Sequence, residues 1–170
     1  MTKQAAPLAL IALVPLLATA PAIAATLVNT FNDWTLYSNA AGGQICFLAG
    51  VPSATEPAGL KRDPALLYIS AWPKDGVKAE VSVKLGFPAK KASDIVVTVS
   101  GQATGTFKLF AKDDRAFVQD TTQELKLLEA MKKGSKLSVQ AVSEKGTSVT
   151  DTYSLQGMTA AHQALGGGCP

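Results

Sequence analysis

The sequence contains few of the residue types that catalysis and metal binding most often require. Among 170 residues there is one histidine, His162, and there are two cysteines, Cys46 and Cys169. Two widely separated cysteines and one histidine make a poor set of zinc ligands. A Cys-x-x-Cys redox motif and a glycine-rich phosphate loop are also absent from the sequence. We therefore expect no metal, no other cofactor and no enzymatic activity.

Charge is also scarce. Charged residues make up 17% of the chain, and the net charge at pH 7 is only +3. The basic doublets at 61–62, 90–91 and 132–133 are scattered along the chain, as is typical of solvated turns. Because nucleic-acid binding usually requires a clustered basic face, the sequence predicts no nucleic-acid partner.

The N-terminus has the pattern of a secretory signal peptide. Lys3 precedes an apolar run over residues 8–17, and Ala22-Ile23-Ala24 fits a small-x-small cleavage site. The run is short for a membrane span, which needs about 20 apolar residues, although an uncleaved anchor remains the alternative. We expect residues 1–24 to be a signal peptide and residues 25–170 to form one periplasmic or secreted domain without an integral membrane segment.

Export bears directly on the two cysteines. Disulfides form and persist in oxidising compartments, and Cys46 and Cys169 allow a single intramolecular pairing. Three glycines at residues 166–168 let the chain end bend into reach. The closed loop is long, so the chain-entropy model assigns the bond about 5 kcal/mol. A free reactive thiol or a metal site is the rival interpretation.

Most of the remaining chain has the alternation of β-strands. In residues 77–85, apolar side chains alternate with polar ones, which predicts one face on a core and one in water. Further β-rich runs occupy 66–72, 95–100, 106–110 and 115–118.

Two hairpins are expected as well. Residues 136–155 form one around the turn Ser143-Glu144-Lys145-Gly146. Residues 33–38 and 44–50 form an opening pair around a glycine-rich turn. Many short strands at short spacing predict an all-β fold, which we expect to be a β-sandwich-like domain of antiparallel strands with its C-terminus held by the disulfide.

Two segments have helical rather than strand periodicity. In residues 121–134, Thr121 and Glu124 fit a capping box, and Leu125, Leu128 and Met131 are spaced to share one face. The second segment, 157–167, repeats its apolar residues at helical spacing at Met158, Ala161 and Leu165. The sequence therefore predicts one or two short helices beside the strands.

The sequence contains only weak candidates for a catalytic site. A Ser-His-Asp arrangement could use Asp151, Ser154 and His162, but Ser154 lies in an expected strand without a Gly-x-Ser-x-Gly elbow. Asp113 and Asp114 are the nearest paired carboxylates for glycoside hydrolysis, and their context favours a polar hairpin turn.

Aromatic residues in strands usually belong to the core. Trp72 is the exception, because it lies at a strand end before Pro73 and Lys74. We take Trp72, Lys74 and Tyr68 as candidate partner-binding residues. Tyr153 is instead expected to be a corner residue whose hydroxyl bonds the nearby backbone.

The chain resembles the invasion-associated locus B family of exported bacterial proteins, from Phe31 to Cys169. The most specific stretch begins at Gly134 and reads "GSKLSVQAVSEKGTSVTDTYSLQGMTAA". "FNDW", "CFLAGVP", "KLGFP" and "EAMKKG" also match. The chain departs from the family pattern at Lys145, where arginine is usual, at Met158 in place of phenylalanine, and at Phe117, where tryptophan is common.

The resemblance implies an all-β exported domain with one disulfide and a link to the association of bacteria with host cells. We expect an envelope interaction module that binds a protein partner in the envelope or on a host surface. The alternative is a periplasmic small-molecule binder or a cryptic hydrolase. An exposed aromatic patch favours the first, and a polar pocket that holds His162 or an acid pair favours the second.

Overall fold

The residues that the structure describes form one antiparallel sheet of eleven strands with two α-helices packed on it. The computed structural model describes residues 25–39 and 45–167, so the expected signal peptide and Cys169 lie outside the described residues. The strands are ordered β1-β2-β3-β5-β6-β9-β8-β7-β10-β11-β4 across the sheet. Their bounds are β1 Thr26–Phe31, β2 Trp34–Asn39, β3 Ile45–Gly50, β4 Ala54–Glu56, β5 Leu66–Trp72, β6 Val77–Lys84, β7 Ile95–Gly101, β8 Gly105–Lys112, β9 Arg115–Val118, β10 Gly134–Val142 and β11 Ser148–Ser154. The helices are η1 Pro73–Asp75, α1 Thr121–Lys133 and α2 Met158–Gly166.

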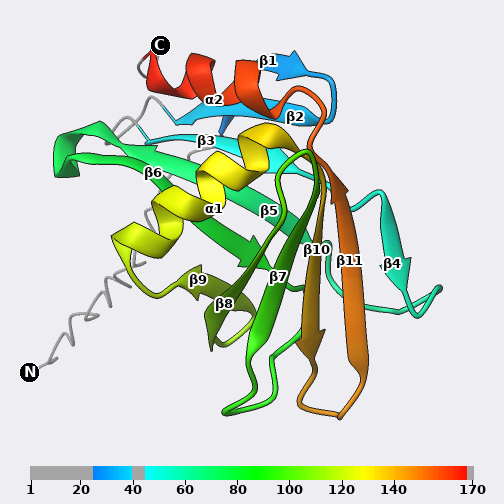
Figure 1. Ribbon diagram of the computed structural model, residues 1–170. Coiled ribbons are helices and arrows are strands. Elements are labelled where there is room, and N and C mark those ends of the chain that lie inside the picture. Colours follow the sequence, from blue (N-terminus) through cyan, green and yellow to red (C-terminus); the bar gives the residue numbers. More distant parts are fainter. Residues whose placement is uncertain (1–24, 40–44, 168–170) are drawn as a thin grey trace, which may run out of the picture.

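The expected all-β antiparallel class is confirmed, whereas the division into two sheets is not. In Figure 1, β2 and β3 run across the view while β7, β10 and β11 run down it, so the two halves of the sheet cross. The pairing of β6 with β9, which sets Ser82 opposite Phe117, joins the halves into one curved sheet. In a β-sandwich the two halves would form separate sheets, and β6 would not pair with β9.

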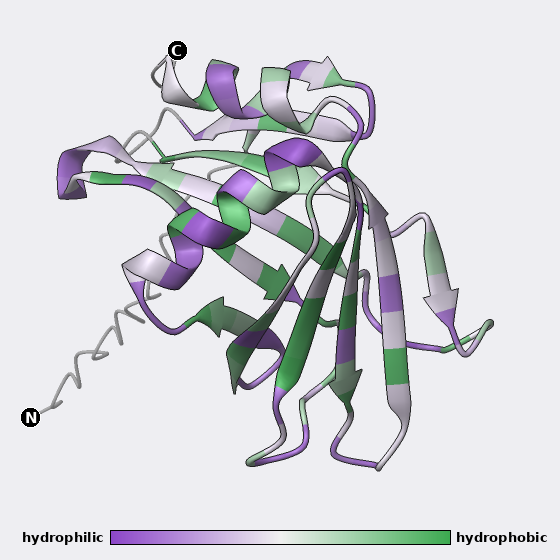
Figure 2. Cartoon of the chain, in the orientation of Figure 1, coloured by the Kyte–Doolittle hydropathy of each residue, from purple (hydrophilic) through white to green (hydrophobic). Residues whose placement is uncertain are grey.

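The concave side of the sheet forms one hydrophobic core. Val81, Val83 and Leu85 are at most 1% exposed, which confirms the buried face expected for this segment, whereas Ser82, expected on the face in water, is also buried at 5% exposed. Figure 2 shows hydrophobic bands along β5 and β7, whereas α1 mixes hydrophilic and hydrophobic residues. Residues from both halves of the sheet join a single buried cluster.

Helix α1 lies across this core, but its start and its buried face differ from the sequence prediction. Asp120 is the cap, since its carboxylate accepts a hydrogen bond from the backbone N–H of Gln123 (2.9 Å). The expected capping box of Thr121 and Glu124 is therefore wrong, because the cap lies one residue earlier. Leu125 is 59% exposed, and Leu127 takes its place in the core with Leu128 and Met131.

Helix α2 presents the predicted face of Met158, Ala161 and Leu165, all of which are buried. It packs on β1, β2 and β3 and touches α1. The turn before α2 requires a glycine. Gly157 has a φ of +85°, and a Cβ added there would lie 2.0 Å from the carbonyl oxygen of Phe31.

The predicted hairpins are confirmed. β10 and β11 pair in register from Lys136↔Ser154 to Val142↔Ser148. Their turn includes Gly146, which has a φ of +83° and donates its N–H to the Ser143 carbonyl (2.8 Å). β2 pairs with β3 as expected, while the predicted glycine-rich turn between them lies outside the described residues. Asp113 and Asp114 form the tight turn between β8 and β9.

Candidate binding surface

Aromatic rings from five strands gather on the outer face of the sheet. We call Tyr37, Phe47, Tyr68, Phe117 and Phe110 the aromatic row. The rings of Tyr37 and Phe47 stack with centroids 5.2 Å apart, and Phe47 meets Tyr68 edge-on at 5.8 Å. Phe117 and Phe110, paired across β9 and β8, lie 5.7 Å apart. The row therefore places apolar surface on the side of the sheet away from the core.

Part of the aromatic row surrounds a shallow depression, which we call the aromatic hollow. Its volume is about 350 Å³. Ser70 and Ser82 are 8% and 5% exposed and line it. Their hydroxyls make no hydrogen bond to another described residue but are not sealed from water, unlike Trp34 Nε1 and Tyr153 OH. The other lining residues are Ile45, Phe47, Tyr68, Trp72, Glu80, Arg115 and Phe117.

Two of the three predicted binding residues meet in this hollow. Tyr68 and Trp72 line it together, whereas Lys74 lies exposed in η1 and is not among the lining residues. The sequence prediction missed Arg115, whose guanidinium carbon lies 6.0 Å from the centre of the Tyr68 ring. Burial raises the pKa of Tyr68, and the Arg115 charge opposes this rise.

A second polar cluster lies between β4, β11 and the loop before β5. We call Arg62, Asp151 and Thr55 the arginine cluster. Arg62 Nη1 donates to Asp151 Oδ2 (2.8 Å) and to the Leu85 carbonyl (2.6 Å), while Nη2 pairs with Asp151 Oδ1. Thr55 Oγ1 donates to the same Oδ1 (2.6 Å). The side chains of Arg62 and Asp151 are only 8% and 2% exposed.

The arginine cluster corrects two predictions. Arg62 was expected in a solvated turn, but it is held in a buried ion pair and its guanidinium lies 5.6 Å from the Phe87 ring centre. Asp151 was a candidate member of a Ser-His-Asp arrangement. Both of its oxygens are bound by Arg62, so the structure does not bring it together with His162 as a catalytic pair.

Tyr153 is a core residue, 1% exposed, but its predicted hydrogen bond to backbone is wrong. Its hydroxyl has no hydrogen-bond partner among the described residues. β11 directs the ring into the core cluster. Burial, with the nearby Asp151 charge, raises its pKa far above the usual range.

His162 lies in a different groove, between α1, β6 and the end of α2. This groove has a volume of about 610 Å³ and also contains Glu80, Glu124 and Glu129. Burial lowers the pKa of His162, as does the charge of Lys132, while Glu129 opposes them. The sequence prediction did not identify Glu80 and Glu124 as neighbours, because they come from different elements. Ser154 does not line the groove.

The acids of this groove are partly withdrawn from water. Burial raises the pKa of Glu80. Burial also raises the pKa of Glu124, an effect that the Val81 N–H opposes and the Glu80 charge reinforces. That N–H donates to Glu124 Oε1 at 2.7 Å.

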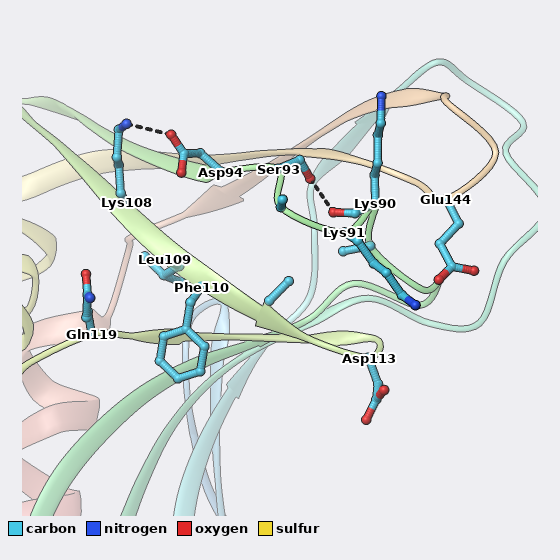
Figure 3. A pocket seen from close by; sticks show the side chains of 13 residues that line it. Lys90, Lys91, Ser93, Asp94, Lys108, Leu109, Phe110, Asp113, Gln119 and Glu144 are labelled. Atoms are coloured by element: carbon cyan, nitrogen blue, oxygen red, sulfur yellow. Dashed lines mark hydrogen bonds and ion pairs between the residues drawn. The ribbon is translucent and has the colours of Figure 1, made fainter.

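Another depression, of about 480 Å³, borders the end of the aromatic row. Figure 3 shows Phe110 among the lining side chains, together with the ion pair of Lys108 and Asp94, whose Nζ–Oδ2 distance is 2.5 Å. Both members of that pair are more than half exposed. Its lining of opposite charges defines no single ligand chemistry.

The described residues also lack a membrane-spanning helix and a cluster of metal ligands. None of their helices has the length and hydropathy needed to cross a bilayer. Nor do they contain a group of three or more histidine, cysteine, aspartate or glutamate side chains placed to hold a metal ion.

Comparison with known proteins identifies the family. The model of the family described as "Invasion associated locus B (IalB) protein" matches residues 35–166, well over half of the chain. The crystal structure of invasion associated protein b from Bartonella henselae is similar, with a TM-score of 0.58 and 12% identity, over 82% of this chain and 96% of that one. At such low identity the likeness shows the fold alone. No curated protein matches the chain. The chain therefore belongs to the invasion associated locus B family.

Proposed function

We propose that this protein is exported to the envelope and acts by binding a protein partner through the aromatic row, without catalysing a reaction. The observation that carries the proposal is the row itself, which joins aromatic rings from five strands on the outer face of the sheet. Tyrosine, tryptophan and arginine dominate the energetics of protein interfaces, and Tyr68, Trp72 and Arg115 lie together here. The name of the family supports a role in contact with host cells.

In-cell crosslinking of the tagged, exported protein, followed by mass spectrometry, tests this role. Tyr68→Ala and Trp72→Ala should each lower partner recovery by about tenfold or more, the effect of losing one interface hot spot. Leu125→Ala is the matched control, because it removes an exposed apolar side chain from α1, outside the aromatic row. Undiminished recovery of the same partner with both aromatic variants would refute the proposal.

The hydrolase alternative depends on a separate observation, the placement of His162 in one groove with Glu80 and Glu124. If the groove is catalytic, His162→Ala and Glu80→Gln abolish hydrolysis of chromogenic esters or glycosides and leave the melting temperature unchanged. If either variant changes only stability, or if the unaltered protein hydrolyses none of the substrates, the alternative is excluded.

We further propose that Cys46 and Cys169 form the disulfide. Cys46 is buried and pairs across the ladder with Ala71. Leu165 and Gly166, at the end of α2, line a depression together with that same Ala71. The chain is therefore three residues from Cys169 when it passes beside the strand pair that contains Cys46.

Reduction of this bond should lower the melting temperature, because a long loop is released in the unfolded state. The chain-entropy model sets the loss at about 5 kcal/mol as an upper figure. The double variant Cys46→Ser/Cys169→Ser should melt at the temperature of the reduced protein and should not respond to reductant. Equal melting of the oxidised and reduced proteins would contradict the pairing. N-terminal sequencing of the exported chain tests cleavage after Ala24.

A further inference from the structure

The aromatic hollow is lined by two serines whose hydroxyls make no hydrogen bond to another described residue and remain open to water. Ser70 and Ser82 are more than nine-tenths buried, and they line the hollow without a hydrogen bond of their own. They lie diagonally on the neighbouring strands β5 and β6, two residues out of register, since Tyr68 is opposite Ser82 and Ser70 is opposite Glu80. A ligand that covers these hydroxyls displaces their water, so it must carry polar groups at its inner edge.

The side walls of the hollow, in contrast, favour an apolar ligand surface. Phe47, Tyr68 and Phe117 are aromatic, and Phe47 and Tyr68 meet edge-on. Aromatic faces favour contact with apolar surface. A suitable ligand thus combines apolar faces with hydrogen-bonding groups around its rim.

Charged side chains complete the lining. Glu80 offers carboxylate acceptors, and Arg115 offers guanidinium donors close to the Tyr68 ring. Burial raises the pKa of Glu80, so this carboxyl is partly withdrawn from water. Donors and acceptors are therefore both available above the two serines.

An apolar side chain of a protein partner fits this lining poorly. A leucine or phenylalanine placed over Ser70 and Ser82 would exclude water from two hydroxyls and give them no partner, which is unfavourable. A pyranose ring has C–H faces that contact aromatic rings and equatorial hydroxyls that can exchange hydrogen bonds with serine, glutamate and arginine. A volume of about 350 Å³ admits a ring of that kind.

We propose that the aromatic hollow is a subsite for one pyranose ring of a glycan. This inference rests on the proposed role of the aromatic row as a binding surface and adds the chemical class of one ligand. The ring lies against Tyr68 and Phe47, and its hydroxyls are bound by Ser70, Ser82, Glu80 and Arg115.

Titration of the purified, oxidised protein with chitohexaose, maltohexaose and cellohexaose tests the inference. Isothermal calorimetry measures affinity, and saturation-transfer NMR shows which sugar protons contact the protein. Saturable binding of at least one hexasaccharide is expected, with its C–H protons nearest the aromatic rings.

Variants then locate the bound sugar. Ser82→Val keeps a residue suited to a strand but removes the hydroxyl, and it should weaken binding about five- to tenfold, the effect of one lost hydrogen bond. Tyr68→Ala should abolish measurable binding, whereas Tyr68→Phe keeps the ring and should bind. Leu125→Ala should bind like the unaltered protein. Melting curves confirm that each variant is folded.

Each negative outcome has a definite meaning. Binding of none of the three hexasaccharides by folded protein overturns the inference, as does binding that Ser82→Val and Tyr68→Ala leave unchanged. The proposed function is tested independently by crosslinking. A protein partner lost with Tyr68→Ala, in the absence of sugar binding, retains that function and removes the glycan subsite. Sugar binding without any protein partner retains the glycan subsite and refutes the proposed binding of a protein partner.

Discussion

The arginine cluster and the aromatic hollow both contain polar side chains with little exposed surface, yet the hydrogen bonding of these side chains differs. In the arginine cluster, Asp151 receives hydrogen bonds from Arg62 and Thr55, all inside the chain. In the aromatic hollow, the hydroxyls of Ser70 and Ser82 have no such partner among the described residues. The Asp151 carboxylate, bound inside the chain, serves the fold, whereas the serine hydroxyls, which are left to water, are available to a ligand.

Breaking the arginine cluster should have the largest effect on stability. Asp151→Ala leaves the Arg62 charge buried and unpaired, and it should lower the free energy of unfolding by about 3–5 kcal/mol. Urea denaturation followed by tryptophan fluorescence measures this loss. The double variant Arg62→Met/Asp151→Leu should lose much less, because neither charge remains. A loss below about 1 kcal/mol for Asp151→Ala, the value of an exposed pair, would show that the cluster is solvated.

Glu124 is an intermediate case, because it is half-buried and has one internal partner. Glu124→Ala leaves the N–H of buried Val81 without its acceptor and should cost about 1–3 kcal/mol. Glu124→Gln keeps an acceptor oxygen and should cost less. Equal losses for the two variants would show that the hydrogen bond to Val81 contributes nothing.

The stability difference between Glu124→Gln and the unaltered protein should also depend on pH. The folded pKa of Glu124 is raised above the ordinary value of 4.5. Its stabilising contribution is therefore present below pH 4.5 and is lost as pH rises through the folded pKa, where the folded protein has to give up a proton it holds more tightly. Glu124→Gln should thus gain stability relative to the unaltered protein between pH 4 and pH 7. A difference that is constant with pH would refute the raised pKa.

The smallest effect is expected in the aromatic hollow. Ser70→Ala and Ser82→Ala remove hydroxyls that have no partner, so stability should change by no more than about 0.5 kcal/mol. Thermal melting measures this, with Thr55→Val in the arginine cluster as the contrast, where loss of one hydrogen bond should cost about 1 kcal/mol. A serine variant that loses more than Thr55→Val would remove the distinction between the two places.

Local patterns predicted much of the fold. Alternation over 77–85 identified a strand whose buried face is confirmed, and helical spacing identified the buried face of α2. Helix α1 was found, but Leu125 was assigned to the core in place of Leu127. Both choices are periodic, and only the docking of α1 on the sheet decides between them.

The aromatic hollow and the arginine cluster depend on residues far apart in the sequence, so their composition was less predictable than the strands and helices. Tyr68 and Trp72 were found from one segment, but Arg115 comes from β9, which becomes a neighbour only through the β6–β9 seam. Arg62 and Asp151 are 89 residues apart in the chain. A basic doublet gives no sign that one of its members has a buried partner so far away.

The placement of α2 has a consequence for the order of folding. This last described helix covers β1, β2 and β3, and Gly157 before it contacts the carbonyl of Phe31. The first strands therefore cannot complete their packing until almost the whole chain is present. Because such contacts join residues far apart in sequence, folding should be slow compared with that of small helical proteins. A chain that crosses a membrane N-terminus first, as the proposed export requires, would thereby remain unfolded during its passage and complete its fold only when its C-terminus has emerged.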